Sequence, residues 1–198
     1  MLWTTMILLA AGLAATSAPT AAQETASRPD MREVHAILLG LAIDGETPLP
    51  DGAADIYTSV LDDPAAPRLV TRLEVAIDPC RSRTIAALQF PGQWAGLTLA
   101  LADLRRITGV AAYASVDDMI RKRNPLRYDD PRAAQVVLTG DGLYCGSRIP
   151  LANDEGASRT TCGDRIDLSM IDEEQRARGR AALAAAGRTC RITALQPG

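Results

Sequence analysis

The chain has 198 residues, of which 47% are hydrophobic, and this is enough to bury the core of a single domain. Its formal net charge of −3 and its pI near 5.2 argue against a nucleic-acid partner, because surfaces that bind phosphate backbones are basic. With one histidine, His35, the chain lacks the ligands for a zinc site built on several histidines.

The amino terminus has the pattern of a secretory signal peptide. Residues 1–22 carry no charged side chain, and an apolar run over 6–15 is followed by small residues that end at Ala22. About ten strongly apolar residues are too few for the roughly 20 that span a bilayer, which disfavours a retained anchor. We therefore expect cleavage after Ala22, a periplasmic or secreted protein, and no membrane span after cleavage. Residues 23–29 are expected to form a flexible segment, and residues 30–198 a single disulfide-stabilised domain.

The first part of this domain is expected to form a helix followed by an antiparallel meander. Asp30 and Glu33 have capping-box spacing, and apolar residues then recur on one helical face up to a stop at Gly45. Residues 55–61 are expected to form a short edge strand. From Arg68 the apolar period changes to two, which is typical of half-buried strands, and the short links favour antiparallel pairing. The three strands of this pattern span residues 68–78, 84–90 and 97–102.

The second part of the domain is expected to extend the sheet and to end in a helix. The Gly-Asp-Gly segment at residues 140–142 predicts a hairpin turn between strands 134–139 and 143–148. Asp172 begins a final helix that runs to Ala186, and its alanine-rich side predicts close packing on a sheet. Smaller elements are expected at 109–114 (strand), 116–123 (helix) and 165–170 (strand). The predicted fold class is α+β, an antiparallel β-meander that forms a curved sheet or a partly open barrel, covered by an N-terminal and a C-terminal helix.

Four cysteines in an exported chain predict two disulfides, because extracytoplasmic compartments are oxidising. Three connectivities are possible, and we favour Cys145–Cys162 together with Cys80–Cys190. The first pair closes a loop rich in turn-forming residues, and the second ties an early strand to the end of the last helix. On the chain-entropy model the two bridges contribute about 3 and up to about 5 kcal/mol to stability.

Few residues in this chain suit catalysis or cofactor binding. The sequence contains no closely spaced cysteine pair, no G-x-S-x-G nucleophile motif and no phosphate-binding glycine loop. Nucleophilic catalysis with a histidine base needs His35, and a serine–lysine dyad needs Lys122, the one lysine. We interpret His35 as a structural histidine on the first helix and Lys122 as a cation at a helix end. We therefore assign no catalytic residue, no metal site and no cofactor.

The densest cluster of cationic side chains is a candidate partner-binding patch, since arginine and tyrosine are favoured at interface anchors. A solvated helix end and loop is the alternative interpretation of the same residues. The candidate patch consists of Arg121, Lys122, Arg123, Arg127 and Tyr128.

These features together favour an exported, disulfide-stabilised, non-enzymatic binding or accessory module that recognises a protein or an envelope component. The first alternative is a small hydrolase that depends on His35 or on two distant carboxylates, as glycosidases do. The second alternative is a carrier that holds a small lipophilic ligand inside the curved sheet.

Overall fold

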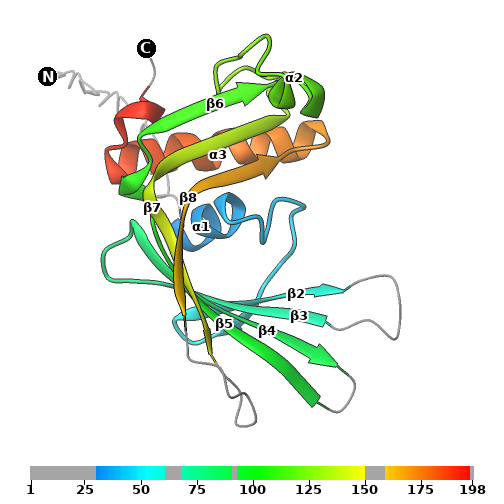
Figure 1. Cartoon of the computed structure of the whole chain (residues 1–198), viewed down its shortest axis with the longest axis vertical. Coiled ribbons are helices and arrows are strands. Elements are labelled where there is room, and N and C mark those ends of the chain that lie inside the picture. The colour runs from blue at the N-terminus through cyan, green and yellow to red at the C-terminus, as the bar shows by residue number, and fades with distance from the viewer. Residues whose placement is uncertain (1–29, 61–67, 91–92, 150–158, 197–198) are drawn as a thin grey trace, which may run out of the picture.

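The computed structural model describes residues 30–60, 68–90, 93–149 and 159–196 (Figure 1). The expected signal peptide and the flexible segment after it lie outside this part of the chain. The described residues form one open, mostly antiparallel sheet of eight strands, with three α-helices and two short 3₁₀ helices. An α+β fold with a curved sheet is therefore confirmed, and the sheet does not close into a barrel.

The first five strands form the expected meander. Each pairs antiparallel with the next, as the short links predicted. The second strand is not at the edge of the sheet as expected, because a short first strand pairs with its outer side. The five strands are β1 (Leu49–Asp51), β2 (Ala54–Val60), β3 (Arg68–Val75), β4 (Arg81–Phe90) and β5 (Gln93–Asp103).

The hairpin predicted around residues 140–142 is wrong. β7 (Gln135–Ile149) runs through this segment as a single strand of 15 residues. Its first half pairs with β6 (Gly109–Tyr113) and its second half with β5, while β8 (Thr160–Ser169) pairs along both halves. Five residue steps along β7, from Thr139 to Tyr144, match two steps along β8, so the glycine segment is a bulge that interrupts the ladder.

Close backbone contact explains why glycines occupy this bulge. A Cβ atom at Gly140 would collide with the backbone carbonyl oxygen of Arg106. Gly142 adopts a φ of +59°, which side chains with a Cβ atom disfavour. The two glycines therefore let β7 bend past the short 3₁₀ helix η1 (Leu104–Arg106) that joins β5 to β6.

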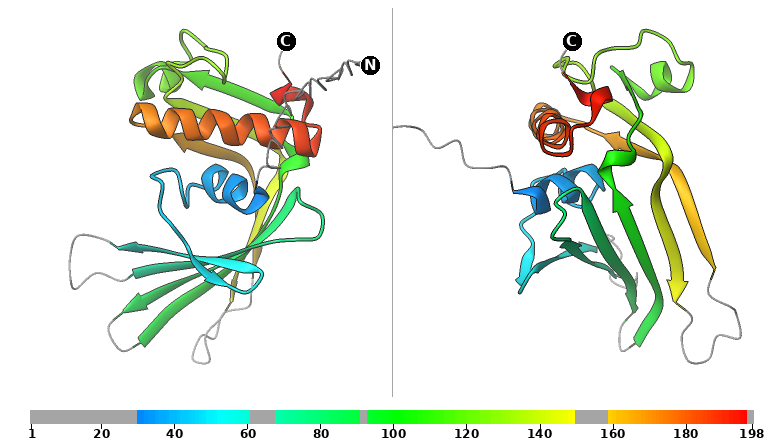
Figure 2. Two further views of the ribbon diagram at one scale, coloured as in Figure 1. Left: turned by 180° about the vertical axis from the view of Figure 1, so that it is seen from behind. Right: turned by 90° about the vertical axis from the view of Figure 1, so that its left-hand side faces the viewer.

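Three α-helices accompany the sheet: α1 (Met31–Leu38), α2 (Val116–Ile120) and α3 (Glu173–Cys190). The expected cap of α1 is present, because Asp30 accepts a hydrogen bond from the Arg32 amide, and Asp172 caps α3 by accepting one from the Gln175 amide. α1 and α3 contact each other and lie on the same side of β7 and β8 (Figure 2). None of the described helices combines the length and the apolar character needed to cross a membrane.

Both long helices end at residues other than the predicted ones. α1 stops at Leu38 rather than near Gly45, since Gly40 takes a positive φ of 75°. α3 continues past Ala186 to Cys190, with Gly187 inside the helix. A Cβ atom at Gly187 would lie 2.8 Å from the Leu195 carbonyl oxygen, so this glycine serves packing rather than termination.

The hydrophobic core lies between the helices and one face of the sheet. Its fully buried members include residues of α1, α3, η1 and strands β3 and β7, and Met170 directly after β8. The small residues of α3 permit the close packing expected from the sequence, because a Cβ atom at Gly179 would collide with the Met170 sulfur. The largest completely buried apolar side chains are Leu38, Leu73, Leu104, Leu138, Leu143, Met170 and Leu183.

The four cysteines form two disulfides, in the pairing favoured from the sequence. Cys80 and Cys190, both buried in the core, join the turn between β3 and β4 to the last residue of α3; we call this bond the core disulfide. Cys145 and Cys162 are directly opposite residues of β7 and β8, and we call their bond the pocket disulfide. The core disulfide spans 110 residues of sequence and the pocket disulfide 17.

Candidate functional site

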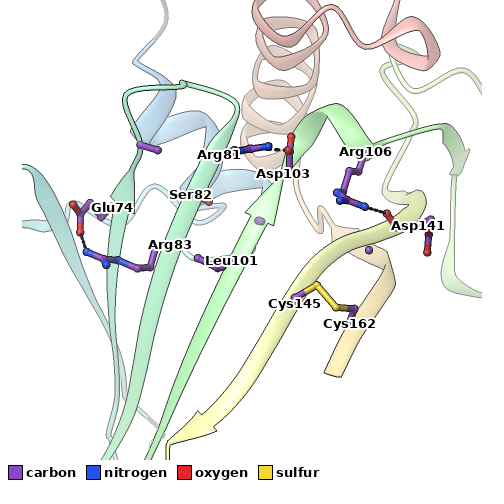
Figure 3. A pocket seen from close by; sticks show the side chains of 13 residues that line it. Glu74, Arg81, Ser82, Arg83, Leu101, Asp103, Arg106, Asp141, Cys145 and Cys162 are labelled. Carbon is purple, nitrogen blue, oxygen red and sulfur yellow. Dashed lines mark hydrogen bonds and ion pairs between the residues drawn. A yellow bond between two sulfur atoms is a disulfide. The ribbon is translucent and has the colours of Figure 1, made fainter. Parts of the chain in front are cut away.

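A pocket of about 800 Å³ lies on the face of the sheet that points away from the helices (Figure 3). Its floor includes a row of side chains that are successive partners across five neighbouring strands. From β3 to β8, this row consists of Glu74, Arg83, Leu101, Cys145 and Cys162. The two cysteines form the pocket disulfide, so the bond that joins β7 to β8 is part of the pocket lining.

Strand alternation places these side chains on the face of the sheet that points away from the helices. Neighbouring residues of a strand point to opposite faces of a sheet. Leu73 of β3 is fully buried in the core, so the adjacent Glu74 points away from it into the pocket. On β5, Ala102 is 7% exposed whereas Leu101 is 54% exposed. The same alternation that builds the core therefore leaves a large apolar side chain in contact with solvent.

Two ion pairs lie in the pocket beside Leu101 and the pocket disulfide, which form the apolar part of its floor. Arg83 pairs with Glu74, and the Nε atom of Arg81 lies 3.0 Å from a carboxylate oxygen of Asp103. Hydrogen bonds from Arg83 and a second arginine lower the pKa of Glu74. Partial burial acts to raise the pKa of Asp103, but hydrogen bonds from Arg105 and Arg81 outweigh it and lower that pKa. Both carboxyls are therefore ionised at neutral pH and are poorly suited to donate a proton in catalysis.

The upper end of the pocket is formed by η1 and by the bulge of β7. The Nη1 atom of Arg106 donates a hydrogen bond of 2.9 Å to the backbone oxygen of Asp141. A Cβ atom at Gly142 would lie 3.0 Å from the same Nη1 atom, so the missing side chain leaves the guanidinium uncovered on that side. In the described part of the chain, no carboxylate lies within ion-pair distance of Arg106, which distinguishes it from Arg81 and Arg83.

The candidate patch from the sequence does not contribute to this pocket. Its arginines are paired locally: Arg121 and Arg123 with Asp117, and Arg127 with Asp129 at 2.9 Å. Tyr128 is partly buried and donates a hydrogen bond of 2.7 Å to the Leu195 carbonyl oxygen. Lys122 takes a positive φ of 49° just after α2. Partner binding by this patch stays a prediction.

His35 lies in the core and not at a site. Its side chain is fully buried, and its Nε2 atom is 3.0 Å from the Pro79 carbonyl oxygen, which requires the proton on Nε2. The Nδ1 atom is buried without a hydrogen-bond partner. Burial lowers the pKa of His35, and it outweighs the Pro79 hydrogen bond and the charge of Asp103, which act to raise it. This neutral, enclosed imidazole does not line the pocket, so its position gives no support to a hydrolase that depends on His35.

Within the described ranges, no three His, Cys, Asp or Glu side chains lie close enough together to hold a metal ion. Comparison with protein-family models, curated proteins and solved structures finds no match for this chain.

Sequence reasoning did not bring the pocket residues together. The alternation along β3 and β5 indicated which residues share a face within each strand, but not which residues of neighbouring strands lie opposite each other. A one-residue slip in register would turn Leu101 to the other face. The signal available in the sequence was the alternation of leucine and alanine along β5. In this alternation Leu101, which is exposed, directly precedes Ala102, which is buried.

Proposed function

We propose that this protein is an exported, disulfide-stabilised, non-enzymatic binding module that recognises a protein or an envelope component in the pocket. The observation that carries the proposal is the pocket itself, which combines the exposed side chain of Leu101 and a disulfide with two ion pairs. Binding sites typically combine a mainly apolar hollow with a few polar groups that orient the ligand. Two disulfides support an oxidising compartment.

The hydrolase alternatives have less support. Glu74 and Asp103 in the pocket are held ionised by arginines, and the one histidine is enclosed in the core. Acid–base catalysis needs a group whose pKa lies near the working pH and which reaches the substrate. The pocket is therefore better suited to hold a ligand than to transform one.

Site-specific photo-cross-linking tests the proposal. A benzophenone side chain in place of Leu101 is expected to capture an envelope component in the exported fraction. The matched control is the same side chain in place of Ile171, which is 83% exposed and does not line the pocket. Adducts at position 101 and none at position 171 support the proposal. The absence of adducts at position 101, or equal adducts at both positions, contradicts it, as does turnover of a substrate by the purified chain.

A further inference from the structure

The apolar floor of the pocket continues along β5 beyond Leu101. Leu99 and Leu97 follow at two-residue intervals, so their side chains point to the same face. Four residue steps along a strand, from Leu97 to Leu101, span about 13 Å, which gives the length of this apolar row. One apolar strand partner lies on each side of the row: Ile85 on β4 is opposite Leu99, and Ile149 on β7 is opposite Leu97.

These side chains form a surface separate from the hydrophobic core. None of the three β5 leucines belongs to the core cluster beneath the helices. Leu101 is 54% and Ile149 38% exposed, while Leu97 and Leu99 are half-buried. Contiguous exposed apolar surface of this kind marks binding grooves more often than ordinary solvent-facing sheet. We call Leu97, Leu99 and Leu101 the leucine row.

Among the described residues that line the pocket, Arg106 is the one cation without a carboxylate partner, and it lies at the pocket end of the leucine row. Arg81 and Arg83 are each paired with a carboxylate, so their charges are already balanced. Arg106 donates one of its five N–H groups to the Asp141 backbone oxygen, and no other hydrogen bond from its side chain is present among the described residues. Guanidinium groups bind carboxylate and phosphate oxygens in a bidentate geometry. The site thus presents one anion-binding group at one end and an apolar strip at the other.

From this arrangement we propose that the pocket binds a single-chain amphiphile, with its carboxylate or phosphate group at Arg106 and its alkyl chain on the leucine row. This proposal rests on the proposed function and names the class of envelope component that the pocket takes. The volume of about 800 Å³ falls within the range of small-molecule sites, whereas a protein partner would require a much wider complementary surface.

The test is isothermal titration calorimetry on the purified, oxidised chain with decanoate, decyl phosphate and uncharged decanol, each below its aggregation concentration. We expect both anions to bind, and decanol to bind at least tenfold more weakly. Inorganic phosphate alone should give no measurable binding, because it lacks the chain that the leucine row would bury. Binding of inorganic phosphate as tight as that of decyl phosphate would instead identify a simple phosphate site and overturn the proposal.

Two substitutions with matched controls locate the amphiphile. Arg106→Gln should weaken decanoate to the level of decanol, while Arg188→Gln, at an exposed arginine of α3 that does not line the pocket, should change nothing. Leu101→Thr should weaken decanoate and decanol alike by about tenfold, since the chain loses apolar contact. Its control is Leu49→Thr, at a residue that is 67% exposed on β1 and outside the pocket.

Several outcomes overturn this inference. Equal affinity for decanol and decanoate, or unchanged affinity in both the Arg106 and the Leu101 variants, would show that binding occurs elsewhere or without an anion site. Failure of every amphiphile to bind, together with protein adducts at position 101, would overturn the inference and leave the proposed function standing. Failure of every amphiphile together with no adduct at position 101 would overturn both.

Discussion

The fully buried His35 predicts that acid destabilises this protein well before its carboxylates titrate. An ordinary histidine has a pKa near 6.5, and that value applies to the unfolded chain. In the native state burial lowers the pKa of His35. Below pH 6.5 the unfolded chain therefore binds a proton that the native protein does not bind, and the free energy of unfolding falls as the pH falls. Above pH 6.5 both states are neutral and the effect disappears.

The size of the effect follows from linkage. One proton bound only by the unfolded state changes stability by up to about 1.4 kcal/mol per pH unit. Between pH 7.5 and pH 5.5 the expected loss is therefore at most about 1.4 kcal/mol, since protonation of the unfolded chain begins near pH 6.5. Ordinary carboxyl groups titrate near pH 4, and His35 is the one histidine, so no other side chain is expected to titrate between pH 7.5 and pH 5.5.

The assay is urea denaturation with the disulfides intact, at several pH values between 7.5 and 5.5. The His35→Gln variant keeps an amide donor near the Pro79 carbonyl oxygen and has no group that titrates in the window. We expect wild-type stability to fall with pH and the stability of the variant to stay constant, whatever the absolute stability of the variant. Wild-type stability that does not change over this range, or a variant that loses as much as wild type, would refute the reasoning.

Three further predictions concern the disulfides and the bulge of β7. Mild reduction followed by alkylation and mass spectrometry should label the pocket disulfide first, because it lines an open pocket while the core disulfide is buried; labelling in the reverse order would contradict this. Replacing both cysteines of the core disulfide with alanine should lower the free energy of unfolding by up to about 5 kcal/mol, against about 3 kcal/mol for the pocket disulfide, because the first closes the longer loop; denaturant titrations that rank the two losses the other way would refute it. Gly140→Ala should cost about 1–3 kcal/mol through its collision with the Arg106 carbonyl, whereas Gly146→Ala, on the same strand with no neighbour closer than 3.8 Å, should cost little in the same titration; equal losses would show that the bulge tolerates a side chain.

The local elements were largely predictable from the sequence. Asp30 and Asp172 cap their helices through hydrogen bonds to amides two and three residues away, so each cap depends on neighbours in sequence. The alternation through Leu73 and Glu74 likewise indicated a half-buried strand, since successive side chains point to opposite faces. Such patterns need no knowledge of distant segments.

The departures at the bulge of β7 and at Gly187 involve contacts with residues outside the strand or helix itself. Gly140 and Gly142 have the composition of a hairpin turn, but the backbone of Arg106, more than 30 residues earlier, packs against them and the strand continues. Gly187 was expected to follow the last helix, and its contact with Leu195 places it inside the helix instead.

The candidate site belongs to the same class of features. Leu101 faces the pocket because of its register with Arg83 and Cys145, and Arg106 reaches the site because β7 bends beside it. The sequence by itself determined the helix caps and the alternation of the early strands, because these depend on hydrogen bonds and side-chain directions between near neighbours. The tertiary structure alone decided the bend of β7, the burial of His35 and the pocket, because register and close backbone approach arise only when the strands and helices pack together.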